Sequence, residues 1–180
     1  MEKSRSIYIG LLALFIGASL LGGSAIFVRI SETSPSLTAF YRALLALPFL
    51  LFWVLSTKSD IPLRSYLTKP NLIVLILAGV FFGSDMAIWN WSISFTSVAH
   101  ATLMANTAPI FVTLVSLFFL RQEIKSPFLG SLFLSFLGVT IVIFAGSGSD
   151  SGRLLGDSLG LVAAIFYAAY ILAIKKLTDS

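Results

Sequence analysis

The 180-residue sequence contains no cysteine, and only 11% of its residues are charged. The absence of cysteine excludes disulfide frameworks, thiol catalysis and cysteine-ligated zinc or iron–sulfur sites. Soluble domains carry about 25% charged residues, and 12 basic against 8 acidic side chains are too few for a phosphate-binding surface. The composition therefore excludes a soluble globular domain, a disordered chain and a nucleic-acid-binding protein.

Apolar residues make up 57% of the chain and gather into long runs. A membrane-spanning helix needs about 20 predominantly apolar residues. Six stretches meet or approach that length: Tyr8–Val28, Leu37–Leu55, Leu72–Ile93, Ala101–Leu120, Phe128–Ala145 and Leu154–Ile174. None alternates with a period of two, as a barrel strand would. The sequence therefore predicts an all-α polytopic membrane protein, a bundle of about six transmembrane helices in the lipid bilayer.

The first apolar stretch also has features of a signal peptide. Lys3 and Arg5 precede it, and small residues at 23–25 resemble a cleavage site. The run continues to Val28, however, and five more spans follow. We therefore expect the first helix to stay in the protein.

Basic residues are distributed unevenly between the two ends of the predicted spans. Nine fall on one side: Lys3, Arg5, Lys58, Arg64, Lys69, Arg121, Lys125, Lys175 and Lys176. Arg29 and Arg153 fall on the other side, and Arg42 lies inside a span. Because Lys and Arg are enriched in cytoplasmic loops, this pattern predicts a multi-pass protein of the cell membrane with both chain ends cytoplasmic.

The first and sixth spans share a weak internal repeat. At an offset of 146 residues, Gly10 aligns with Gly156, Ala18 with Ala164, and Arg29 with Lys175. The two helices would cross the membrane in opposite directions. Inverted repeats of this kind are typical of secondary transporters.

Several short motifs follow one another in a fixed order. They are Phe27-Val28-Arg29, the segment 39–43 (AFYRA), the segment 95–104 (FTSVAHATLM), the segment 120–123 (LRQE) and Gly156-Asp157. With these motifs the chain resembles the EamA-like transporters of the drug/metabolite transporter superfamily. Arg121 stands where that family usually has Gly.

The resemblance implies ten spans in two inverted repeats. We accordingly expect a cytoplasmic N-terminus at 1–7, a five-helix repeat at 8–146, and an external loop and sixth helix opening a truncated second repeat at 147–180. The implied function is transport of a small metabolite, an amino acid or another small organic solute, by secondary transport or export and without a cofactor. The alternative is a truncated, non-transporting membrane protein, or a half-transporter that pairs with a second copy or a missing second half.

An enzymatic function is not expected. The sequence has neither HExxH nor GxSxG, and no second carboxylate well inside a span could pair with Asp85.

Asp85 is the first candidate for binding substrate. It lies near the middle of the third apolar stretch, with Trp89 and Ser92 on the same helix face. Its carboxylate could couple transport to a proton or cation, or contact a substrate amine. A structural ion pair or a helix–helix hydrogen bond is the alternative. Trp89 could pack against a substrate or a cation, or face lipid.

Arg42 is the second charged candidate, and it lies closer to the membrane surface. It could recognise a substrate carboxylate, extend outward to the interface, or pair with Asp85. The fourth apolar stretch adds a polar stripe of Thr102, Asn106, Pro109 and Thr113, predicted to share one face. Pro109 should kink that helix and free a carbonyl near Ala105. Such a stripe could line a pathway or only join helices.

Small residues predict close helix packing at three places: Gly79 and Gly83, the ridge of Gly156, Gly160, Ala164 and Ala168, and Ala18 with Gly22. His100 is expected to be an interfacial anchor. Asn90 begins a formal glycosylation sequon, which its position inside a span makes irrelevant.

Overall fold

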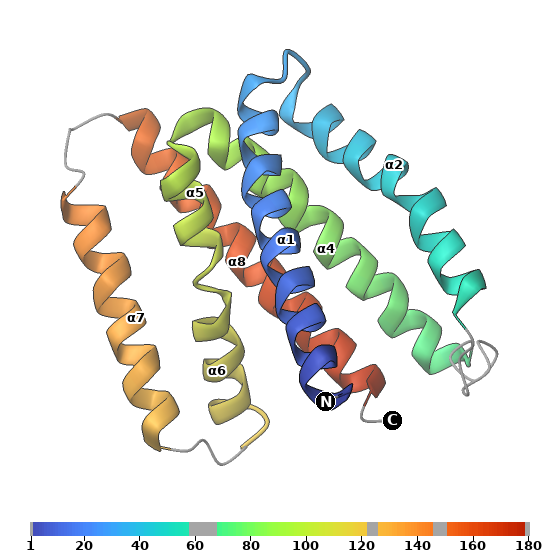
Figure 1. Cartoon of the computed structure of the whole chain (residues 1–180). Helices are drawn as coiled ribbons and strands as arrows, with labels where there is room; N and C mark the ends of the chain where they lie inside the picture. The colour runs from blue at the N-terminus through green and yellow to red at the C-terminus, as the bar shows by residue number, and fades with distance from the viewer. Residues whose placement is uncertain (1, 58–67, 122–125, 146–150, 179–180) are drawn as a thin grey trace.

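The computed structural model describes residues 2–57, 68–121, 126–145 and 151–178. Its helices are α1 (Glu2–Ile30), α2 (Pro35–Ser56), α4 (Lys69–Phe95), α5 (Val98–Ala105), α6 (Ala108–Phe118), α7 (Ser126–Ala145) and α8 (Ser151–Thr178) (Figure 1). The predicted loop around Lys58 and Arg64, the Gln122-Glu123 part of one motif and the turn at 146–149 lie outside the described residues.

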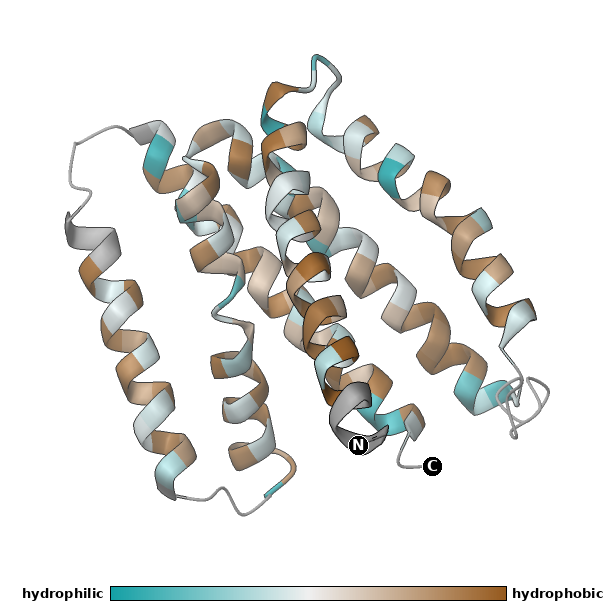
Figure 2. Cartoon of the chain, in the orientation of Figure 1, coloured by the Kyte–Doolittle hydropathy of each residue, from teal (hydrophilic) through white to brown (hydrophobic). Residues whose placement is uncertain are grey.

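The all-α membrane architecture is confirmed. Five helical segments are long and apolar enough to cross a membrane: Ile7–Ile30, Pro35–Ser56, Lys69–Phe95, Val98–Phe118 and Gly152–Thr178. The remaining predicted span forms α7, whose described apolar stretch, Pro127–Ile141, is shorter. Figure 2 shows hydrophobic residues along the helices and hydrophilic residues concentrated toward their ends. Helix α1 begins at Glu2, so the predicted tail at 1–7 largely continues the first helix.

Local sequence explains where the helices begin. The Ser34 hydroxyl accepts a hydrogen bond from the backbone N–H of Leu37 (3.4 Å), and Pro35 opens α2. A serine cap and a proline in the first turn both satisfy the geometry of a helix start. Ser97 caps α5 in the same way, through the backbone N–H of His100 (3.1 Å).

Helix α8 packs along α4, α5 and α6, and runs in the opposite direction to α4 (Figure 1). A Cβ atom built on Gly156 would lie 2.7 Å from Thr96 Cβ, and one on Gly160 would lie 2.7 Å from Met104 Cβ. Further along, Ala164 and Ala168 are buried against Ala108. The predicted small-residue ridge of α8 is therefore confirmed as the face that packs closest to its neighbours.

The other two predicted ridges are wrong for the part of the chain that is described. A Cβ atom on Gly79, Gly83 or Gly22 would meet nothing within 4 Å, and Ala18 is exposed. A GxxxG spacing permits close approach but does not specify the partner helix.

The two ends of the bundle are identified by the helix ends that lie there. The end where α1 finishes and α2 and α8 begin is called the Arg29 end below, and the start of α1 and the end of α8 lie at the opposite end (Figure 1).

Helices α1, α2 and α7 carry many exposed apolar side chains, including Phe15 (73% exposed) and Phe52 (74%). Such surfaces suit lipid or further helices rather than water.

Replacing Gly160 by Ala should lower the free energy of unfolding by about 1–3 kcal/mol, because the new methyl group overpacks the contact with Met104. Gly83→Ala is the matched control on α4, where no neighbouring atom would be displaced, so it should leave stability unchanged or slightly raised. Reversible unfolding in detergent measures both. Equal stability of the two variants would contradict the α8 contact.

Candidate functional site

The fourth predicted span is broken into α5 and α6 at Asn106 and Thr107. Pro109 lies in the first turn of α6, and it has no N–H to donate to the carbonyl of Ala105 four residues earlier. Asn106 instead ends α5, and the Thr107 hydroxyl donates to the carbonyl of Met104 (2.6 Å). The predicted kink at Pro109 is confirmed.

The break prevents the polar residues of this span from sharing one face, so that prediction is wrong. Thr113 is buried and donates to the carbonyl of Pro109 (2.6 Å), whereas Asn106 and Pro109 are exposed. Asn106 Nδ2 donates to the carbonyl of Thr102 (2.9 Å). Thr102 Oγ1 is buried, and no hydrogen-bond partner reaches it from the described residues.

Asp85 lies half-buried on α4, on the side of that helix that faces α8. Seven residues along, Ser92 is fully buried and donates to the carbonyl of Gly156 (2.7 Å). Four residues back, the ring of Phe81 packs near that of Phe166, with centroids 6.3 Å apart. Within the described ranges, the Asp85 carboxylate makes no hydrogen bond or ion pair.

Arg42 on α2 contacts two neighbouring residues of α4. Its Nη1 donates to Asn90 Oδ1 (3.3 Å), and its guanidinium lies over the ring of Trp89, 5.5 Å from the centroid. The suggested ion pair between Arg42 and Asp85 is therefore not formed. Trp89 does pack against a cation, and that cation belongs to the protein itself.

Asn90, discounted in the sequence, joins α2 to α4. It is fully buried, and its Nδ2 donates to the carbonyl of Pro35 (3.2 Å) while its Oδ1 accepts from Arg42. A carboxamide inside an apolar run costs free energy unless it is hydrogen-bonded. A lone carboxamide inside the third apolar stretch was therefore the sequence signal that could have identified Asn90 as a helix-joining residue.

Asp157, near the start of α8, is a buried carboxylate that the sequence offered only as part of the Gly156-Asp157 motif, with no contact predicted. Its Oδ1 accepts from the Thr96 hydroxyl (2.8 Å), and its Oδ2 lies 3.5 Å from His100 Nδ1 and 3.9 Å from Arg153 Nε. His100 therefore joins α5 to α8, a contact that the expected interfacial position did not include. An i, i+4 pair of Arg153 and Asp157 was readable in the sequence, but its distant partners were not.

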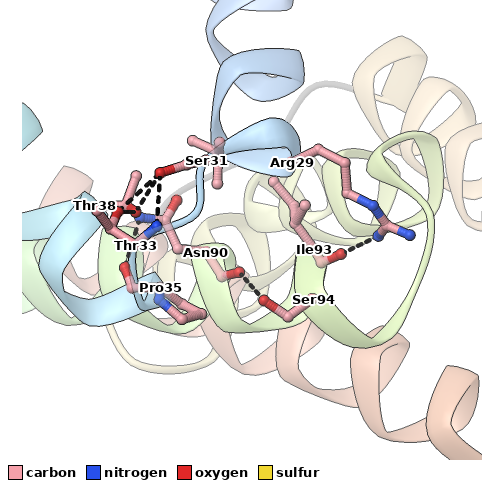
Figure 3. Close-up of a pocket in the computed structure, with 9 residues that line it drawn as sticks. Arg29, Ser31, Thr33, Pro35, Thr38, Asn90, Ile93 and Ser94 are labelled. Carbon is pink, nitrogen blue, oxygen red and sulfur yellow. Dashed lines mark hydrogen bonds between the residues drawn. The ribbon is translucent and has the colours of Figure 1, made fainter.

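Two cavities of about 300 and 360 Å³ lie beside α1 at the Arg29 end. Figure 3 shows the hydroxyl groups of Ser31, Thr33 and Thr38 converging in the smaller one, with Arg29 directed away from them. Arg29 donates to the carbonyls of Ile93 and Thr96, the second at 2.7 Å. Its charge therefore satisfies the last carbonyls of α4, which favour a cation.

The polar groups fall into two sets with different capacity to bind a ligand. At the Arg29 end, Asp157 and Arg29 are bonded to protein atoms. Deeper in the bundle, Asp85 and Thr102 retain unused capacity. No group of three or more metal-ligating side chains occurs among the residues searched, which are the described ones.

Asp157→Ala should lower the free energy of unfolding by about 1–3 kcal/mol, because it leaves the buried Thr96 hydroxyl without its acceptor. Ser158→Ala, one residue along on the exposed side of α8, should have little effect. Thermal unfolding in detergent compares the two. An Asp157 variant as stable as the Ser158 variant would show that the cluster is not structural.

Comparison with known proteins identifies the family. The model of the EamA-like transporter family matches residues 8–144. An uncharacterized transporter of Archaeoglobus fulgidus is 31% identical over 176 residues, which cover 92% of this chain and 57% of that protein. The uncharacterized transporter YetK of Bacillus subtilis is 27% identical over 186 residues, covering 99% of this chain and 54% of that protein.

The chain thus spans little more than half the length of these two relatives. No solved structure matches it. Because the family model covers well over half of the sequence, in the region of α1 to α7, the chain belongs to the EamA-like transporter family.

Proposed function

We propose that this chain takes part in membrane transport of a small organic solute, an amino acid or another small metabolite, by secondary transport or export. Family membership supports transport, as do the names of the relatives. The structural observation that carries the proposal is the half-buried Asp85 carboxylate, which has no partner among the described residues. An ionisable side chain inside a membrane costs roughly 2.5–3.5 kcal/mol even on insertion scales, and such groups commonly mark solute or ion pathways.

The break between α5 and α6 lies close to Asp85 in depth. Gly160 of α8 approaches both Ser92 on α4 and Met104 on α5, which sets a common level for the two helices. Asp85 lies seven residues before Ser92, about 10 Å away from the Arg29 end, and Thr107 lies three residues after Met104, about 5 Å in the same direction. The carboxylate and the break therefore differ by about one helical turn. Interrupted helices at such depths line the binding sites of many transporters.

Each proposed substrate-binding residue offers a different interaction. Asp85 would bind an amine, a proton or a coupling cation, and Thr102 and Asn106 would supply a hydroxyl and a carboxamide. Trp89 would supply an aromatic face, and Arg42 holds that ring by lying over it. A solute with both polar and apolar groups would use this combination.

The proposed orientation places both chain ends in the cytoplasm, because nine of the basic residues gather on that side. The exposed apolar faces of α1, α2 and α7 support completion of the pathway by further helices. These would come from a second repeat or from a second copy of the chain. Without them, the chain would be a membrane protein that does not transport.

Asp85→Asn should abolish transport while leaving insertion and helix content unchanged, because the amide cannot bind a proton or a cation. The test is uptake of labelled amino acids and of small organic acids and amines into vesicles that contain the chain. Glu32→Gln, the same chemical change in an exposed loop, is the control and should transport normally. Normal uptake by the Asp85 variant would remove this carboxylate from the mechanism. Absence of uptake by the unmodified chain, alone and with a second repeat supplied, would favour the non-transporting alternative.

Thr102→Val should raise the KM for the transported solute severalfold without lowering stability. The substitution keeps the shape of the side chain and removes a buried hydroxyl that has no protein partner among the described residues. A structural role for that hydroxyl would instead appear as a lower unfolding temperature with an unchanged KM.

A further inference from the structure

The two cavities beside α1 are neighbours. Both are lined by Val28, Ser31 and Thr38, so they meet at these three residues. One extends to Asn90 and Ser94 on α4, and the other extends between α1 and α2. This second cavity, lined by Leu20, Ser24, Phe27, Val28, Ser31, Thr38 and Arg42, is called the α1–α2 groove.

The α1–α2 groove has a polar part and an apolar part. Arg42 from α2 lies together with the hydroxyl groups of Ser24, Ser31 and Thr38, whereas α1 contributes the apolar side chains. Of these, Leu20 is 70% exposed and Phe27 71% exposed. Both lie on a helix that is long and apolar enough to cross a membrane, so the rim of the groove suits an apolar partner such as a lipid chain better than water.

Arg42 has donors left over. A guanidinium carries five N–H donors, and Arg42 makes one hydrogen bond, to the neutral Asn90, within the part of the chain that is described. No carboxylate pairs with it there, since both ion pairs among these residues involve Asp157. Arg29 differs, because its Nη1 donates to two backbone carbonyls at the end of α4, whose partial negative charge favours a cation. The groove therefore contains the half-buried guanidinium of Arg42, which has no anionic partner among the described residues.

Arg42 lies near the start of α2, in the part of the helix closest to the Arg29 end. It lies seven residues after Pro35, which is about 10 Å along α2, and an arginine side chain extends toward the membrane surface when it can. Deeper along the same stripe of α2, Leu45 and Phe49 are exposed.

We propose that the α1–α2 groove binds a monoanionic phospholipid from the leaflet at the Arg29 end. The phosphate accepts hydrogen bonds from Arg42 and from the hydroxyl group of Ser24, whereas the hydroxyl groups of Ser31 and Thr38 are hydrogen-bonded within the protein. One acyl chain lies along Leu20 and Phe27. A water-soluble anion would match the charge alone, whereas a lipid also matches the apolar rim. This lipid site shares Arg42 with the proposed solute site, where Arg42 lies over the Trp89 ring, but it contains neither Asp85 nor Thr102, and it does not depend on transport.

Native mass spectrometry of the purified chain tests the proposal. The probes are phosphatidylglycerol and phosphatidylcholine with identical acyl chains, and glycerol 1-phosphate as the soluble anion. We expect phosphatidylglycerol to be retained in preference to phosphatidylcholine, and glycerol 1-phosphate not to displace it. Arg42→Gln should reduce this preference about fivefold, the contribution of one basic residue near an anionic leaflet, and Arg42→Lys should restore most of it.

Arg121→Gln removes an exposed arginine outside the groove and should retain the preference. Ser24→Leu keeps every charge and fills the groove, so it should lower phosphatidylglycerol retention even where an Arg42 variant is too unstable to study. Equal retention of the two lipids by the unmodified chain would overturn the proposal. So would full retention by Ser24→Leu, or displacement by glycerol 1-phosphate, which would show a site for soluble anions.

Discussion

The close contact of α8 with α4 and α5 is the constraint on which the rest of the described structure depends. Lipid tails are as apolar as leucine, so helices in a membrane gain little by burying apolar surface against each other. They associate through close packing and interhelical hydrogen bonds instead. Gly156 and Gly160 allow backbones to approach closely, and the hydrogen bond from Ser92 to the carbonyl of Gly156 and that from Thr96 to Asp157 form at the same level.

This contact also determines which polar groups remain available. Near the Arg29 end, protein partners satisfy Asp157, Asn90 and Arg29. Further along α8 than Gly160, Phe166 and Tyr170 pack against rings of α4, and Ala164 and Ala168 pack against Ala108 of α6. Among the described residues, none of these side chains gives Asp85 a hydrogen-bond partner. Among the described polar groups, Asp157, Asn90 and Arg29 near the Arg29 end are hydrogen-bonded within the protein, whereas Asp85 and the Thr102 hydroxyl toward the middle are not. That division supports a structural role for the first set and a ligand-binding role for the second.

The sequence predicted the helical architecture and the break at Pro109 because each follows from local chemistry: an apolar run long enough to span, and a residue without an N–H. It also identified the packing ridge of α8. It could not distinguish that ridge from Gly79 and Gly83, because the same spacing permits contact without specifying a partner. Asn90 and Asp157 were missed for a related reason. Their roles depend on Pro35, Arg42, Thr96 and His100, which are distant in sequence and become neighbours only when the helices pack.

Disulfide cross-linking measures the central contact most directly, because the chain has no cysteine of its own. A double variant with Thr96→Cys and Asp157→Cys places two thiols where a 2.8 Å hydrogen bond now joins the side chains. We expect mild oxidation to cross-link this pair in intact membranes, and to leave a Gly83→Cys and Asp157→Cys pair open. A Thr96–Asp157 pair that stays reduced, or that reacts no faster than the control pair, would contradict the docking of α8 on which the proposed division of polar groups rests.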